Sequence, residues 1–143
     1  KPDVVISGIN RGYNIGIDTL YSGTVGAALQ ALYFGYKAVA FSGDYNGIKN
    51  IKKTFESTFK KIISEDLLSD NYILNINLPQ DKFEDIKGIK FTNLHYVETD
   101  LKGELTENEF IPDRKVIKGE LPYDSDVYAF KNGFTSITKI SLK

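Results

Sequence analysis

The amino-acid sequence contains no cysteine, so it can form neither a disulfide bond nor a thiolate metal site. It has no apolar run near the roughly 20 residues of a membrane-spanning helix, and no signal-peptide pattern opens it. Positive charge is not in excess: 18 Lys and Arg residues stand against 19 Asp and Glu residues, for a formal net charge of -1. A general nucleic-acid binder needs a basic surface. We therefore expect no membrane partner, no nucleic-acid duplex as a partner, and a cytoplasmic location.

An initiator methionine is missing as well, and the sequence begins at Lys1, directly before an apolar stretch. We interpret this start as a position inside a larger protein. What is present indicates a folded domain: 41% hydrophobic and 26% charged residues are values typical of a soluble globular protein. A length of 143 residues suits one domain with its own core. We therefore treat residues 1–143 as one domain that is incomplete at its N-terminus.

The first part of the chain shows the alternation of an α/β fold. Short, continuously apolar runs at residues 4–6 and 38–41 predict strands that are buried on both faces, as in parallel sheets. Between them, apolar residues recur at the spacing of one helix face over residues 22–35. This order predicts a right-handed βαβ unit. A second amphipathic helix is predicted over residues 48–62, and a third strand over residues 72–78.

The character of the sequence changes from about residue 86 onward. Polar, glycine-containing segments separate short stretches with strand patterns. The predicted strands cover residues 90–94, 110–117, 126–130 and 134–142. Asn132-Gly133 is a strong turn signal between the last two of them, and residues 99–108 are predicted to be an exposed turn or arm. The coarse prediction is an α/β part over residues 1–85, followed by a β-rich part over residues 86–143.

The loop at residues 7–24 has the composition of a phosphate site. It follows the carboxyl end of a predicted parallel strand and precedes a helix, which is where open α/β sheets bind their ligands. The N-terminus of a helix offers unpaired N–H groups and the positive end of its dipole. Ser22 and Thr24 add hydroxyl groups, and Gly23 lets a ligand approach the backbone closely. These three residues are candidates for binding phosphate.

Two asparagines in the same loop extend this interpretation. Asn10 and Asn14 supply amide oxygens and N–H donors, and an oxygen donor beside phosphate suits a hard cation such as Mg²⁺ or Mn²⁺. The glycines do not follow the dinucleotide-binding or P-loop patterns, so neither of those sites is present. A strand-to-helix loop also needs glycines for purely geometric reasons. From the residues alone, a phosphate pocket and a merely structural loop both stay open.

Several blocks of this sequence together resemble a known family. They are Ser7-Gly8-Ile9-Asn10, Asn14-x-Gly16-x-Asp18, Tyr21-Ser22-Gly23-Thr24-Val25, Leu74-Asn75-Ile76-Asn77-Leu78-Pro79, Ser125-Asp126, Gly133 and Ser136-Ile137-Thr138. Their identity and order closely resemble the signature of the SurE survival-protein family across essentially the whole chain. Two departures occur: Lys139 stands where the family usually has proline, and residues 99–122 show little likeness.

The resemblance implies a fold and an activity. Family members have a Rossmann-like three-layer α/β core with parallel strands and an extended β-rich C-terminal part. They are 5′-nucleotidases that also act on other phosphate monoesters. One divalent cation is held by two adjacent aspartates, a serine and an asparagine, and Asn10 matches that asparagine. The other ligands and the catalytic groups are expected before Lys1, so this part alone should be inactive. Asn14, Ser22, Gly23 and Thr24 match positions that line the family's phosphate pocket.

The resemblance leaves function classes open. The leading prediction is a metal-dependent phosphomonoesterase that hydrolyses nucleoside 5′-monophosphates or other small phosphomonoesters. A non-catalytic module that binds nucleotide or phosphate is the alternative, and the β-rich part could mainly build a homodimer or homotetramer. The sequence does not reveal the base preference, the nucleophile or the native metal.

Individual residues also allow more than one role. Asn10 could cap its own loop instead of binding a metal, and Asp18 is interpreted as a structural hydrogen-bonding residue. Arg11 could clamp phosphate or simply lie on the surface. His95, the only histidine, is expected at the surface near a strand end. Either of the asparagines at positions 75 and 77 could tie down a neighbouring loop by hydrogen bonds.

Overall fold

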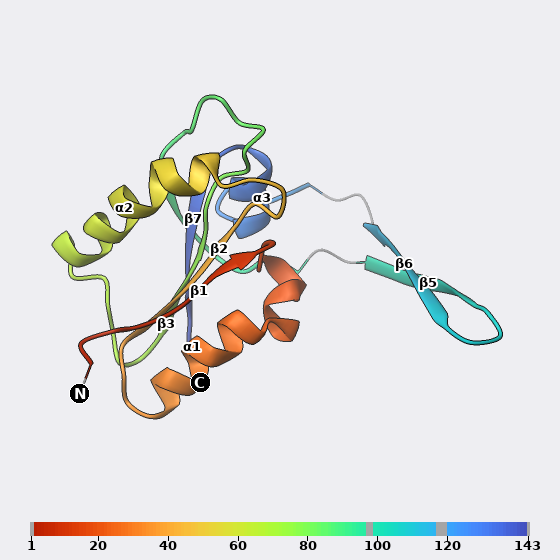
Figure 1. Ribbon diagram of the computed structural model, residues 1–143, viewed down its shortest axis with the longest axis horizontal. Helices are drawn as coiled ribbons and strands as arrows, with labels where there is room; N and C mark the ends of the chain where they lie inside the picture. Colours follow the sequence, from red (N-terminus) through yellow and green to blue (C-terminus); the bar gives the residue numbers. More distant parts are fainter. Residues whose placement is uncertain (1, 97–98, 117–119, 143) are drawn as a thin grey trace.

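The computed structural model describes residues 2–96, 99–116 and 120–142. Its centre is a five-stranded sheet in the order β1-β2-β3-β7-β4, in which β1, β2 and β3 run parallel, β7 runs antiparallel to β3, and β4 runs parallel to β7 (Figure 1). These strands are β1 (Val5–Arg11), β2 (Ala38–Gly43), β3 (Ile73–Asn77), β4 (Ile89–Thr92) and β7 (Thr135–Ile140). The predicted apolar strands near residues 4–6, 38–41 and 72–78 are confirmed.

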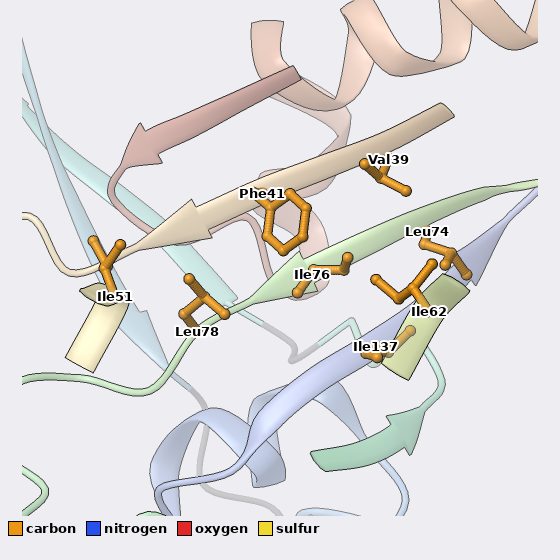
Figure 2. Packing of buried hydrophobic residues seen from close by; sticks show 8 residues of the cluster. All are labelled: Val39, Phe41, Ile51, Ile62, Leu74, Ile76, Leu78 and Ile137. Carbon is orange, nitrogen blue, oxygen red and sulfur yellow. The ribbon is translucent and has the colours of Figure 1, made fainter. Parts of the chain in front are cut away.

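Two helices cover the two faces of this sheet, which gives three layers (Figure 1). On one face, Ala38 and Ala40 of β2 pack with α1 (Gly23–Tyr33). On the other face, Val39 and Phe41 pack with Ile51 and Ile62 of α2 (Lys49–Ser64), as Figure 2 shows. Successive residues of a strand point to opposite faces, so a strand between two helices must be apolar at every position. The predicted α/β class with a three-layer core is therefore confirmed.

The C-terminal part contributes both to the central sheet and to a projection. β4 and β7 extend the sheet that β1, β2 and β3 begin, so residues on both sides of position 86 share one sheet. β5 (Thr99–Leu105) and β6 (Phe110–Val116) form an antiparallel hairpin, and among the described residues they pair with no other strand. This hairpin stands away from the sheet and its helices (Figure 1). The predicted arm at residues 99–108 is thus one strand and the turn of this hairpin.

The predicted strand at residues 126–130 is wrong, because the structure forms the helix α3 (Asp126–Lys131) there. Ser125 caps this helix, since its Oγ accepts a hydrogen bond from the Tyr128 N–H at 3.0 Å. The apolar and aromatic residues at positions 127–130 suggested a strand, but a serine cap followed by an acidic first turn favours a helix start. Asn132-Gly133 then ends a helix instead of joining two strands. Over the residues that the structure describes, no helix is both long and apolar enough to cross a membrane.

Candidate phosphate and metal site

Two glycines shape β1 and the loop that leads from it toward α1. Gly8 has a φ of +109°, and a Cβ atom on it would lie 2.3 Å from the carbonyl oxygen of Phe41. Gly16 has a φ of +50°, and a Cβ atom there would lie 2.7 Å from the carbonyl oxygen of His95. Only glycine tolerates such a close backbone approach together with a positive φ. The geometric explanation for these two glycines therefore holds, whether or not the loop binds a ligand.

A buried network of amide groups fixes the position of Asn14. Its backbone N–H donates to Asn77 Oδ1 at 2.8 Å, and its carbonyl accepts from Asn75 Nδ2 at 2.8 Å and Asn77 Nδ2 at 3.1 Å. The Asn14 side chain donates through Nδ2 to Ser42 Oγ at 2.6 Å. The prediction that an asparagine of β3 ties down a loop is confirmed, and both asparagines do so. Each buried group left without its partner would cost about 1–3 kcal/mol.

Asp126 anchors the same loop from the C-terminal part of the chain. Its side chain is fully buried and accepts three backbone hydrogen bonds, from the N–H groups of Gly16 at 2.7 Å, Val127 at 2.8 Å and His95 at 3.0 Å. Burial raises the pKa of this carboxyl group, and the three N–H donors oppose that rise. Sequence reasoning placed Asp126 in a strand and gave it no role. An aspartate directly after a serine cap was the available signal.

The start of α1 presents unused backbone donors. Ser22 is the N-cap: its Oγ accepts from the Val25 N–H at 3.1 Å, and its carbonyl accepts from the Gly26 N–H at 2.9 Å. The N–H groups of Gly23 and Thr24 precede this first intrahelical bond, and no described residue accepts from them. Open space surrounds the position where Gly23 would carry a Cβ atom. The N-terminus of α1 is therefore accessible to an anion.

These elements enclose one open pocket of about 510 Å³, a volume within the usual range of small-molecule sites. It is lined by Asn10, Asn14, Asp18, Tyr21, Ser22, Gly23 and Thr24. All five residues that the sequence singled out for metal or phosphate thus lie around the same space. Asp18, interpreted from the sequence as structural, and Tyr21, given no role, line it as well. Both belong to η1 (Gly16–Tyr21), a 3₁₀ helix between β1 and α1.

The structure confirms one of the two roles considered for Asn10, the capping of its own loop. Its Nδ2 donates to the carbonyl of Gly12 at 3.1 Å, so it does cap its own loop. That bond fixes the orientation of the amide, and among the described residues no donor bonds to Oδ1. An amide oxygen held in this way at a pocket wall is a suitable ligand for a hard cation. The capping role and the ligand role are compatible.

Arg11 does not belong to the pocket lining. Its Nη2 donates to the Tyr45 carbonyl at 3.0 Å, and its guanidinium lies 5.5 Å from the centre of the Tyr45 ring. His95 does not line the pocket either, and its backbone rather than its ring takes part in the Asp126 contacts. Across the described ranges, no group of three or more His, Cys, Asp or Glu residues could hold a metal ion.

Comparison with known proteins gives a consistent picture. The family model described as "Survival protein SurE" matches residues 1–100. The chain is 35% identical to the 5′/3′-nucleotidase SurE of Wigglesworthia glossinidia brevipalpis over 98% of its own length and 58% of that protein. It is 38% identical to the 5′-nucleotidase SurE of Thermoanaerobacter sp. (strain X514), again over 98% of its length and 58% of the relative.

A solved structure shows the same fold. The crystal structure of the SurE protein from Aquifex aeolicus superposes with a TM-score of 0.82 at 30% sequence identity. That match covers 100% of this chain and 60% of the Aquifex chain. The 143 residues thus span somewhat more than half the length of the relatives that they match.

Proposed function

Because the chain belongs to the SurE family, we propose that it forms part of a metal-dependent phosphomonoesterase that hydrolyses nucleoside 5′-monophosphates to nucleosides and phosphate. The relatives that are named nucleotidases are longer than this chain, which covers 58% of each of them. The activity is therefore proposed for the whole gene product. The 143 residues would supply the phosphate pocket and one metal ligand, and would be inactive alone.

The observation that carries the proposal is the donor-rich start of α1 in a pocket at the carboxyl ends of β1 and β2. The free N–H groups of Gly23 and Thr24, together with the positive end of the helix dipole, would bind phosphoryl oxygens. The Thr24 hydroxyl and the Asn14 amide provide further polar contacts in the same pocket. A hydrogen bond to a charged group contributes about 1.5–3 kcal/mol. Two or three such bonds would help to offset the entropy cost of binding a phosphate monoester.

The cation in this proposal is Mg²⁺ or Mn²⁺, with Asn10 Oδ1 as one ligand. The Asn10 oxygen fits such an ion, because it has no donor among the described residues and lines the pocket. When bound, the ion would supply positive charge that offsets the charge developing on the phosphoryl group. The remaining ligands and the nucleophile are proposed to lie outside the 143 residues.

A phosphate-binding module without catalysis is the second candidate. It is favoured by the absence of a group of three or more acidic or histidine side chains that could hold a metal within the described part of the chain. The N–H groups at the start of α1 would bind an anion in either case. Turnover of substrate separates the two candidates.

Hydrolysis of AMP by the gene product, including whatever sequence precedes Lys1, tests the proposal. Activity should require added Mn²⁺ or Mg²⁺ and stop with a chelator. Asn10→Ala should raise the Mn²⁺ concentration for half-maximal activity about tenfold, and Asn10→Asp should restore it, because an oxygen ligand returns. Asn71→Ala, which changes an exposed asparagine, is the matched control. Equal Mn²⁺ titrations for Asn10→Ala and wild type would show that Asn10 is not a ligand.

We also propose a cytoplasmic location and assembly into a homodimer or homotetramer. The side chains of Leu105 and Phe110, near the turn of the β5-β6 hairpin, support assembly as exposed apolar surface. Light scattering of the gene product would measure its mass directly. A monomer at micromolar concentration would contradict the assembly part of the proposal.

A further inference from the structure

Two residues of the pocket have no place in a phosphate site. Asp18 carries a negative charge and would repel a phosphate group that it approached directly. Tyr21 presents a large ring that is 74% exposed, beside the N-cap of α1. Both nevertheless line the same pocket as the donors at the start of α1. These two side chains suit a different part of the substrate from the phosphate.

The geometry of η1 brings these two residues together. A 3₁₀ helix has about three residues per turn, so side chains at positions i and i+3 lie above one another. Asp18 and Tyr21 stand in this relation, and the face that they share is turned to the pocket. Thr19, between them, points elsewhere: its side chain is buried, and its hydroxyl donates to the Gly16 carbonyl. The carboxylate and the ring thus form one wall of the pocket.

That wall is firmly positioned. The N–H of Gly16, the first residue of η1, donates to the buried Asp126 carboxylate at 2.7 Å. At its other end, η1 passes directly into Ser22, the capping residue of α1. The two ends of η1 are therefore fixed by contacts in the core and at the helix start. A rigid wall can contribute to specificity because little ordering is needed when the ligand binds.

We infer that Asp18 and Tyr21 bind the nucleoside half of the substrate: Asp18 accepts hydrogen bonds from ribose hydroxyls, and Tyr21 packs its ring against the sugar or base. A carboxylate is a strong acceptor for hydroxyl donors, and an aromatic ring stacks on any base, whatever its identity. The pocket then has two chemically distinct ends, with N–H donors for the phosphate and an acceptor with a ring for the neutral nucleoside. This inference rests on the proposed function.

Binding measurements on four ligands test it without depending on turnover. The ligands are AMP, ribose 5-phosphate, glycerol 2-phosphate and inorganic phosphate, titrated by calorimetry into the gene product in the presence of a chelator, so that none of them is hydrolysed during the titration. Wild type should bind AMP at least 10-fold more tightly than glycerol 2-phosphate. Asp18→Ala should weaken AMP and ribose 5-phosphate about 10-fold or more, as expected when a charged acceptor is lost. It should leave inorganic phosphate within 2-fold.

Replacement of Tyr21 separates the ring from the rest of the site. Tyr21→Ala should weaken AMP about 10-fold and inorganic phosphate less than 2-fold, whereas Tyr21→Phe should keep the affinity of wild type. Tyr33→Ala is the matched control, because Tyr33 is 73% exposed on α1 and does not line this pocket. Asp70→Ala serves in the same way for the carboxylate, since Asp70 is exposed and lies outside the pocket.

The outcomes distinguish the inference from the proposed function. If wild type binds none of the four ligands, the phosphate pocket itself is wrong and the inference falls with it. If all four bind with similar affinity, or if Asp18→Ala weakens inorganic phosphate as much as AMP, only the nucleoside inference is overturned. A loss of Mn²⁺ affinity in Asp18→Ala, with unchanged ligand ratios, would make Asp18 a metal ligand and would also overturn it.

Discussion

Replacement of Asp126 by asparagine tests how the C-terminal part of the chain stabilises the candidate site. The carboxylate accepts from Gly16 through Oδ2 and from His95 and Val127 through Oδ1, at distances of 2.7 to 3.0 Å. Asparagine has one acceptor oxygen, so its NH₂ group must face at least one of these three N–H donors. A buried donor without an acceptor costs about 1–3 kcal/mol. Asp126→Asn should therefore lower the free energy of unfolding by that amount at pH 7.

Urea denaturation followed by circular dichroism measures this loss, with Asp85→Asn as the control at an exposed aspartate. Hydrogen exchange at the Gly16 amide provides a local readout and should be faster in Asp126→Asn than in the control. Asp126→Ala removes both acceptor oxygens and should lose about 3 kcal/mol or more. If Asp126→Asn matched wild type within about 0.5 kcal/mol and left Gly16 exchange unchanged, Asp126 would not be the anchor described above.

Three further predictions concern the same loop and helix start. Burial raises the pKa of the Asp126 carboxyl group, so the folded state binds the carboxyl proton more tightly than the unfolded state, in which the pKa is about 3.9. The free energy of unfolding contributed by this group therefore falls as pH rises between the unfolded and the folded pKa. The difference in free energy of unfolding between wild type and Asp126→Asn should accordingly grow on acidification from pH 7 to 4. If urea unfolding showed that this difference shrinks on acidification, the N–H hydrogen bonds would lower the Asp126 pKa by more than burial raises it. Asn77→Ala removes two hydrogen bonds to the Asn14 backbone. It should lower the free energy of unfolding by about 1–3 kcal/mol, measured by thermal unfolding, and should weaken phosphate binding. Unchanged phosphate affinity would show that the hydrogen bonds of Asn77 do not support the pocket. Ser22→Ala removes the cap of α1 and should cost about 1 kcal/mol. Ser69→Ala, which removes an exposed hydrogen bond from the Asn71 N–H outside any helix or strand, should cost less.

Much of the core could be predicted from local sequence patterns. The apolar run at residues 38–41 indicated a strand buried on both faces, and Val39 and Ala40 do pack on opposite helices. The loop at residues 7–24 was identified as the candidate site because its hydroxyls, amides and glycines stand between a strand and a helix. Those cues lie within one short segment of chain, and the structure gathers the same residues around one pocket.

Contacts between distant segments could not be predicted in the same way. Gly16 and Asp126 are 110 residues apart in sequence, and nothing local to either residue marks the other as its partner. The consecutive apolar residues at positions 127–130 are compatible with a strand as well as with a short helix, and the Ser125 cap favours the helix. β4 and β7 carry no local sign that they join the sheet of β1, because pairing order is set by the whole fold.

The central claim is that the start of α1 and the Asn10 amide bind a phosphoryl group together with a cation. A crystal structure of the gene product grown with phosphate and Mn²⁺, with manganese located by its anomalous scattering, tests this directly. Phosphate oxygens should lie within hydrogen-bond distance of the Gly23 and Thr24 N–H groups, with Mn²⁺ bound to Asn10 Oδ1. Manganese and phosphate bound together elsewhere, with this pocket holding only water, would contradict the account.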